Sequence, residues 1–145
     1  MVLPILWPTF VLVALIFVVW LTMFVQRGAH LRRNPPAPGT FDNGESALRY
    51  FQPVEMAANN LRNLTEMPLL YFALVPLLLI THHAGHVQVV LAWVYVILRI
   101  LHSFIHIVPK HVPSRAMVYL VSCAVLMAMW IGFAVDMAAA GATMR

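Results

Sequence analysis

Four long apolar segments dominate this sequence and restrict its fold more than any other feature. They run over residues 3–25, 54–80, 87–108 and 114–140. At about 1.5 Å per helical residue, each covers the roughly 30 Å hydrocarbon core of a bilayer. Backbone groups in lipid must be paired within the protein, and the segments lack the alternating pattern of barrel strands. The sequence therefore predicts an all-α integral membrane protein, a four-helix bundle with a single domain over residues 1–145.

The balance of charge agrees with a membrane protein. Of the 145 residues, 62% are hydrophobic and 10% are charged, which is too little charge to cover a soluble domain. The net charge of +4 comes from basic residues that cluster beside the apolar segments. That placement is typical of membrane topology, so we expect membrane lipids as partners and no nucleic acid. Residues 1–25 lack a basic n-region and a cleavage site, and we expect them to be retained as a helix.

The loops differ in their basic residues, and this difference predicts the topology. The first loop, residues 27–55, carries Arg27, Arg32, Arg33 and Arg49, whereas residues 81–86 contain no Lys or Arg. The third loop, residues 108–113, carries Lys110. The positive-inside rule then places the first and third loops in the cytoplasm and both termini outside. If the source is prokaryotic, the membrane is the bacterial inner membrane, with the active-site side cytoplasmic.

The second apolar segment begins with a polar stripe. At helical spacing one face carries Asn59, Arg62, Asn63 and Glu66. Ionisable groups at membrane depth cost roughly 2.5 to 3.5 kcal/mol each, so they call for a function or a partner. Arg62 and Glu66 are spaced to pair, and a polar collar at the headgroups is the alternative interpretation. Further on, Pro68 and Pro76 are expected to kink the helix and free backbone carbonyls.

The third and fourth segments each carry a polar stripe on an otherwise apolar helix. Tyr95, Arg99, His102 and His106 follow one another at steps of four, three and four. Arg99 lies roughly 13 Å from the cytoplasmic end, too deep for a snorkelling anchor, and is expected to face Glu66 or a water-filled pocket. Local spacing fixes no third ligand beside the two histidines, so we predict no metal site. The fourth segment adds a stripe of its own, formed by Arg115, Tyr119 and Ser122.

The three stripes converge towards the predicted cytoplasmic leaflet. Arginine predominates among them, and guanidinium groups favour carboxylates and other anions. A pocket of this kind, open to apolar helix surfaces, suits a polar carboxylated cofactor together with a lipophilic small molecule. The residues themselves predict the charge of the pocket without specifying a reaction.

At these positions the chain resembles the MAPEG family, the membrane-associated proteins of eicosanoid and glutathione metabolism. The run Arg62-Asn63-Leu64-Thr65-Glu66, followed by Pro68, is similar to the family's second-helix pattern. Arg99, His102 and His106 match the third-helix arginine and the positions three and seven beyond it. Arg115 and Tyr119 match the arginine and tyrosine that open the fourth helix, and their spacing from Arg99 is like that of prostaglandin E synthase members. The long first loop and the short chain suggest a bacterial-type branch.

The resemblance implies a homotrimer that binds glutathione between neighbouring subunits. Arg115 would then be the catalytic residue, stabilising the thiolate, because a nearby guanidinium lowers the pKa of a thiol. The implied cofactor-binding residues are Arg62, Asn63, Glu66, Arg99, His102, His106 and Tyr119. The implied activity is that of a glutathione-dependent membrane transferase or peroxidase acting on lipophilic electrophiles.

Two departures from the family pattern keep other functions open. His106 stands where a tyrosine is common, and Ala116 stands where some members have a serine proposed in catalysis. They motivate the alternative of a non-catalytic lipid-binding or scaffold protein with the same fold. A small transport or proton-relay protein is a third hypothesis, motivated by the stripe of Arg99, His102 and His106.

Overall fold

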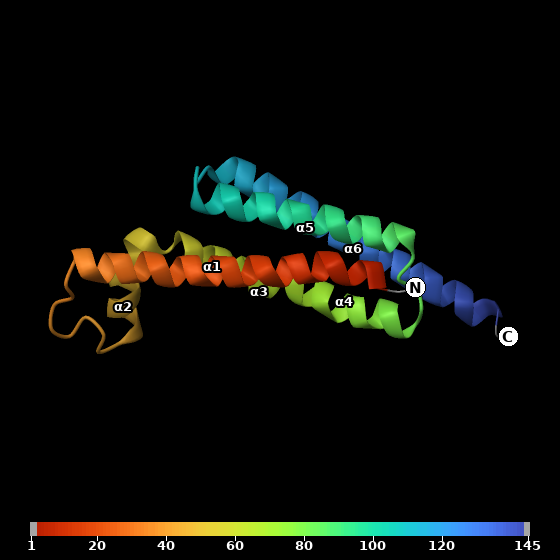
Figure 1. Cartoon of the computed structure of the whole chain (residues 1–145), viewed down its shortest axis with the longest axis horizontal. Coiled ribbons are helices and arrows are strands. Elements are labelled where there is room, and N and C mark those ends of the chain that lie inside the picture. Colours follow the sequence, from red (N-terminus) through yellow and green to blue (C-terminus); the bar gives the residue numbers. More distant parts are fainter. Residues whose placement is uncertain (1–2, 144–145) are drawn as a thin grey trace.

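The computed structural model describes residues 3–143 and has four long helical crossings arranged in an elongated bundle (Figure 1). They are α1 (Leu6–Arg33), α3 with α4 (Met56–Glu66 and Pro68–Ile80), α5 (His86–Ile107) and α6 (Val112–Thr143). All four are long and apolar enough to cross a membrane. The described residues contain no strand. The prediction of an all-helical chain with four membrane-length helices is therefore confirmed.

The loops and the chain ends show which parts of the sequence meet at each end of the bundle (Figure 1). The described chain begins and ends at one end of the bundle, and the α5–α6 turn lies towards the other. Beyond that turn, α1 continues to a projecting segment that contains the short helix α2 (Gly44–Phe51). A 3₁₀ turn, Gln52–Val54, then leads into α3. This arrangement agrees with four crossings in alternating directions.

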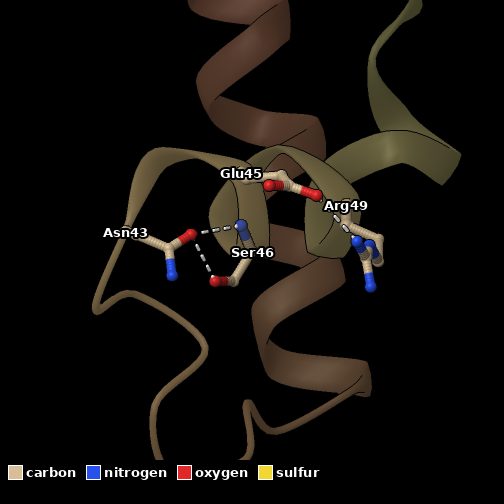
Figure 2. Close-up of polar contacts among 4 residues, drawn as sticks. All are labelled: Asn43, Glu45, Ser46 and Arg49. Carbon is tan, nitrogen blue, oxygen red and sulfur yellow. Dashed lines mark hydrogen bonds and ion pairs between the residues drawn. The ribbon is translucent and has the colours of Figure 1, made fainter.

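The first loop is shorter and more ordered than the sequence suggested. Helix α1 runs on to Arg33 instead of ending near residue 25, and it stops before Pro35 and Pro36, which cannot continue it. Helix α2 was not predicted. Asn43 caps it, accepting hydrogen bonds from Ser46 N at 2.9 Å and Ser46 Oγ at 2.7 Å (Figure 2). Glu45 and Arg49 pair across one turn at 2.9 Å, as Figure 2 also shows.

The second crossing is divided where the prolines predicted a break. Helix α3 ends at Glu66 and α4 begins at Pro68, so Met67 separates two helical pieces. Pro68 has no N–H to donate and tolerates only the first turn of a helix, which explains why the new helix starts there. Pro76, by contrast, lies inside α4, and the helix continues past it.

The buried residues are divided between an apolar half and a polar half of the bundle. The apolar core lies towards the described chain ends and joins Leu12 of α1, Tyr71 and Leu74 of α4, Tyr95 of α5 and Met129 of α6. Towards the α5–α6 turn the buried side chains are largely polar: Asn60, Arg99, His102, Ser103, His106 and Ser122. The convergence of polar residues at one end of the bundle thus places the candidate site there.

The outer surface of the crossings is apolar. Large side chains remain exposed along every crossing, among them Trp7, Phe17, Leu69, Ile97 and Ile131. In water such a surface would favour aggregation, whereas lipid solvates it at no cost. The exposed aliphatic and aromatic side chains therefore belong to the lipid-facing surface of a membrane protein.

Candidate functional site

The candidate site is centred on the Arg99 guanidinium, between α5 and α6. Arg99 is fully buried. Its Nη2 donates to Ser122 Oγ at 2.5 Å and lies 3.7 Å from Cys123 Sγ. Its guanidinium carbon lies 4.8 Å from the centre of the Tyr119 ring and 5.4 Å from that of Tyr95. Arg99 was predicted to face Glu66 or a water-filled pocket. Within the described chain its side chain turns towards α6 and lies between two aromatic rings.

The environment of Arg99 leaves part of its hydrogen-bonding capacity unused. Ser122 Oγ donates in turn to the Tyr119 carbonyl at 2.6 Å, so it links the arginine to the backbone of α6. Within the described residues, Arg99 Nε and Nη1 are buried and have no hydrogen-bond partner. A buried guanidinium with unused donors is costly unless an acceptor reaches it. This position therefore favours an anion or another strong acceptor nearby.

The two histidines extend the cluster along α5. Both are buried, and their rings lie 5.6 Å apart. His102 Nδ1 lies 3.2 Å from the Arg115 carbonyl. A carbonyl only accepts, so Nδ1 carries the hydrogen, and Nε2 of the neutral ring is an acceptor without a partner among the described residues. His102 thus ties the first turn of α6 to α5.

Arg115 and Tyr119 are the accessible members of this cluster. Both are half-buried on the first turns of α6. At the N-terminus of that helix, Ser114 N donates to His111 Nδ1 at 3.4 Å, and Ser114 Oγ lies 2.8 Å from the same atom. The Arg115 guanidinium has no hydrogen-bond or ion-pair partner among the residues that the structure describes. The Tyr119 ring lies 5.6 Å from that of His102 and covers the Arg99 guanidinium. A free cation on a helix N-terminus, backed by a buried cation, is an electropositive place that suits an anion.

The predicted residues of α3 lie on a different surface of the chain. Arg62 and Glu66 are exposed and Asn63 is half-buried. No ion pair joins Arg62 to Glu66 in the described part of the chain, although their spacing allows one. The structure therefore brings Arg99, His102, His106, Arg115 and Tyr119 together and leaves the α3 side chains facing outwards.

Two residues join the cluster that were not predicted to form part of the site. Asn60, on the opposite face of α3 from Arg62, is fully buried and its Oδ1 lies 3.5 Å from Ser103 Oγ. Ser122 had been placed only on the polar stripe of α6, yet it makes the shortest contact with Arg99. In the sequence, Asn60 directly follows Asn59 of the predicted polar stripe. Rotating the predicted inward face of α3 by one residue would have included Asn60 in the site. The described residues contain no group of three or more His, Cys, Asp or Glu able to hold a metal.

A buried polar cluster inside four membrane-length helices defines a small all-helical membrane protein. A comparison with known protein families matches residues 5–135 to the MAPEG family, which is nearly the whole chain. The chain therefore belongs to the MAPEG family. The family includes glutathione transferases and peroxidases as well as non-catalytic members. No curated protein and no solved structure gives a significant match to the chain.

Proposed function

We propose that this protein is a glutathione-dependent membrane transferase or peroxidase that acts on lipophilic electrophiles. The observation that carries the proposal is the buried Arg99 guanidinium of α5, which lies 4.8 Å from the Tyr119 ring of α6, one turn after Arg115, a cation unpaired among the described residues. Membership of the MAPEG family supplies the expected cofactor, because that family generally uses glutathione.

The donor set fits glutathione, which carries two carboxylates, an amine and a thiol. Arg99 Nε and Nη1 are unused buried donors, and Arg115 is an unpaired cation, so the cluster suits carboxylate and thiolate groups. Glu66 offers the complementary charge for an amine. Arg62, Asn63, His102 and His106 complete the set that would hold the tripeptide.

In this proposal the two arginines have different roles because their exposures differ. Arg115 is accessible and would lie against the sulfur, where its charge favours thiolate over thiol. Arg99 is fully buried beside the Tyr119 ring, where its charge and its unused Nε and Nη1 donors would favour a carboxylate of the tripeptide. Bound glutathione supplies the nucleophilic sulfur. The apolar outer faces of the helices give lipophilic substrates access from the bilayer.

The outward α3 side chains support assembly as a homotrimer. Glu66 lies about 15 Å along the second crossing from Met56 and is exposed in the single chain. A carboxylate facing lipid at that depth costs several kcal/mol, so another protein surface is expected to cover it. A neighbouring copy would provide that cover and bring Arg62, Asn63 and Glu66 against the cluster of another subunit.

The decisive experiment is the ultraviolet thiolate signal of glutathione added to the detergent-solubilised protein at neutral pH. We expect a thiolate band with the wild type and its loss with Arg115→Ala, whereas Arg32→Ala, which removes an exposed arginine of α1, should retain it. If neither the wild type nor Arg32→Ala produces the band, the cofactor is not activated here. The lipid-binding or scaffold alternative, motivated by His106 and Ala116, would then take precedence.

A further inference from the structure

A concave site lies at the loop end of the bundle and is lined by none of the residues of the Arg99 cluster. It is a pocket of about 320 Å³ between the end of α1, the turn into α3 and the end of α5. Its charged wall is formed by Arg33 and Lys110, with His30 and Asn34 beside them. Apolar side chains, including Val54 and Ile107, also line it. The lining combines cations with apolar contacts, as a lipid headgroup and its glycerol region require.

The charges around this pocket leave it positive. Arg33 and Lys110 have no ion-pair partner among the residues that the structure describes. The carboxylate beside the pocket, Glu55, is already bound to Arg27 at 2.7 Å. No acidic side chain lines the pocket. Arg33 at the end of α1 and Lys110 in the α5–α6 turn therefore line the same pocket, and neither has a counter-ion among the described residues.

The walls of the pocket are held in place. The Tyr50 hydroxyl donates to the Asn34 carbonyl, and the Tyr50 ring packs edge-on against His30 with centroids 4.9 Å apart. Across the pocket, Lys110 has a left-handed backbone with φ of 56°, and its N–H donates to the Ile105 carbonyl at 2.9 Å. Left-handed residues at helix ends are usually Gly or Asn. Lys110 adopts this backbone although it is neither of these residues.

The pocket lies at the polar boundary of the membrane. The uncharged stretch of α1 from Leu6 to Val25 covers the hydrocarbon core at about 1.5 Å per residue. Gln26, Ala29 and His30, which follow it and line the pocket, lie within about 8 Å of the core, at headgroup level, and the Arg33 backbone lies about one turn further out. Phosphate groups of phospholipids are found at this depth.

We propose that this pocket binds the phosphate of an anionic phospholipid, with Arg33 and Lys110 as its two cationic contacts. A phosphate bound here would bridge α1 to the α5–α6 turn. None of the pocket's lining residues is itself a member of the Arg99 cluster, although Ile107 directly follows His106 in the chain. A zwitterionic lipid is disfavoured because its ammonium group would meet the positive wall.

The test is thermal unfolding of the purified full-length protein in detergent, titrated with short-chain phosphatidylglycerol, the matched phosphatidylcholine or inorganic phosphate. Saturable stabilisation by phosphatidylglycerol is expected for the wild type. Arg33→Ala and Lys110→Asn should each weaken its apparent affinity about tenfold, the loss expected when one charged contact is removed. Arg32→Ala, which removes the neighbouring arginine outside this pocket, should leave the affinity unchanged, and Lys110→Arg should retain it.

Lys110→Asn separates binding from folding. Asn accepts a left-handed backbone more readily than Lys, so the lipid-free protein should unfold at the same or a higher temperature while its lipid response falls. The proposal is overturned if both variants retain wild-type affinity, or if Arg32→Ala weakens binding equally, which would indicate diffuse surface charge. It is also overturned if phosphatidylcholine or inorganic phosphate stabilises the protein as well as phosphatidylglycerol does at equal concentration.

Discussion

At the scale of single residues, Arg99 shows what a buried charge in a membrane bundle requires. Its guanidinium is fully buried, and it donates to the neutral Ser122 hydroxyl at 2.5 Å. The Tyr95 and Tyr119 rings add cation–π attraction, which is stronger at desolvated sites. No carboxylate pairs with Arg99 in the described chain, so its charge remains available to act on a ligand.

Ser122→Ala tests this arrangement. The substitution removes an acceptor from a buried cation, and hydrogen bonds to charged groups contribute about 1.5 to 3 kcal/mol. We expect the free energy of unfolding, measured in detergent, to fall by about that amount. Ser103→Ala is the matched control, because Ser103 is also buried but its contact with Asn60 is neutral and 3.5 Å long.

An equal loss for the two serine variants would contradict a special role for Ser122. The affinity for glutathione, measured by titration, is a second observable, and a simple packing defect would not change it. If Ser122 orients Arg99, the alanine variant should also bind glutathione more weakly at a temperature where it is fully folded. The Ser103 variant should then bind as the wild type does.

At the scale of elements, the sequence predicted what depends on hydrophobic length and missed what depends on local polar contacts. The four crossings follow from apolar runs that only helices can satisfy in lipid, and the break at Pro68 follows from its missing N–H. The extension of α1 to Arg33 was missed because the charged residues that follow the hydrocarbon core were interpreted as part of the first loop. Helix α2 was missed because its eight residues are too few for a periodic signal.

The same distinction explains the partial prediction of the site. Spacing alone placed Arg99, His102 and His106 on one face of α5, and they share that face in the structure. Spacing could not decide which face of α3 turns inwards, since the polar residues there lie on more than one side. Packing resolves this by burying Asn60 and leaving Arg62 exposed.

Helix α2 gives a prediction at this scale. Its cap is Asn43, and replacing a cap residue by Ala costs about 0.5 to 2 kcal/mol. No α2 residue is buried, so little packing compensates for the loss. Asn43→Ala should therefore speed hydrogen exchange of the α2 amides while leaving α5 and α6 protected. Glu45→Ala is the control, since it removes an exposed i,i+4 pair that contributes little.

Exchange that rises equally in α2 and in the crossings of the Asn43 variant would show that α2 is part of the bundle's cooperative unit. An unchanged rate in α2 would show that the aromatic contacts of Phe41, Tyr50 and Phe51, and not the cap, hold the segment.

At the scale of the whole molecule, the single chain has two kinds of outer surface. Most of it is apolar and suits lipid, as Phe17 of α1 illustrates with 60% exposure. The outward face of α3 differs, because Arg62 and Glu66 are exposed on the second crossing. Since lipid does not solvate charges at that depth, this face is where we expect a second copy to pack.

Site-directed cross-linking can locate that contact in a Cys123→Ala background. Thr65→Cys places a thiol on the exposed α3 face, and Phe17→Cys places one on the apolar face of α1. With a short photoreactive maleimide in detergent, Thr65→Cys should give linked chains on illumination, because the reagent reaches whichever residue of the neighbour faces Thr65. Native mass spectrometry should show three copies of the 16.3 kDa chain. Linkage through Phe17 alone would instead put the apolar face at the interface and leave the α3 charges unexplained. A monomer that still activates glutathione would mean that the α5–α6 cluster suffices, so Arg62 and Glu66 would lose their proposed role in binding.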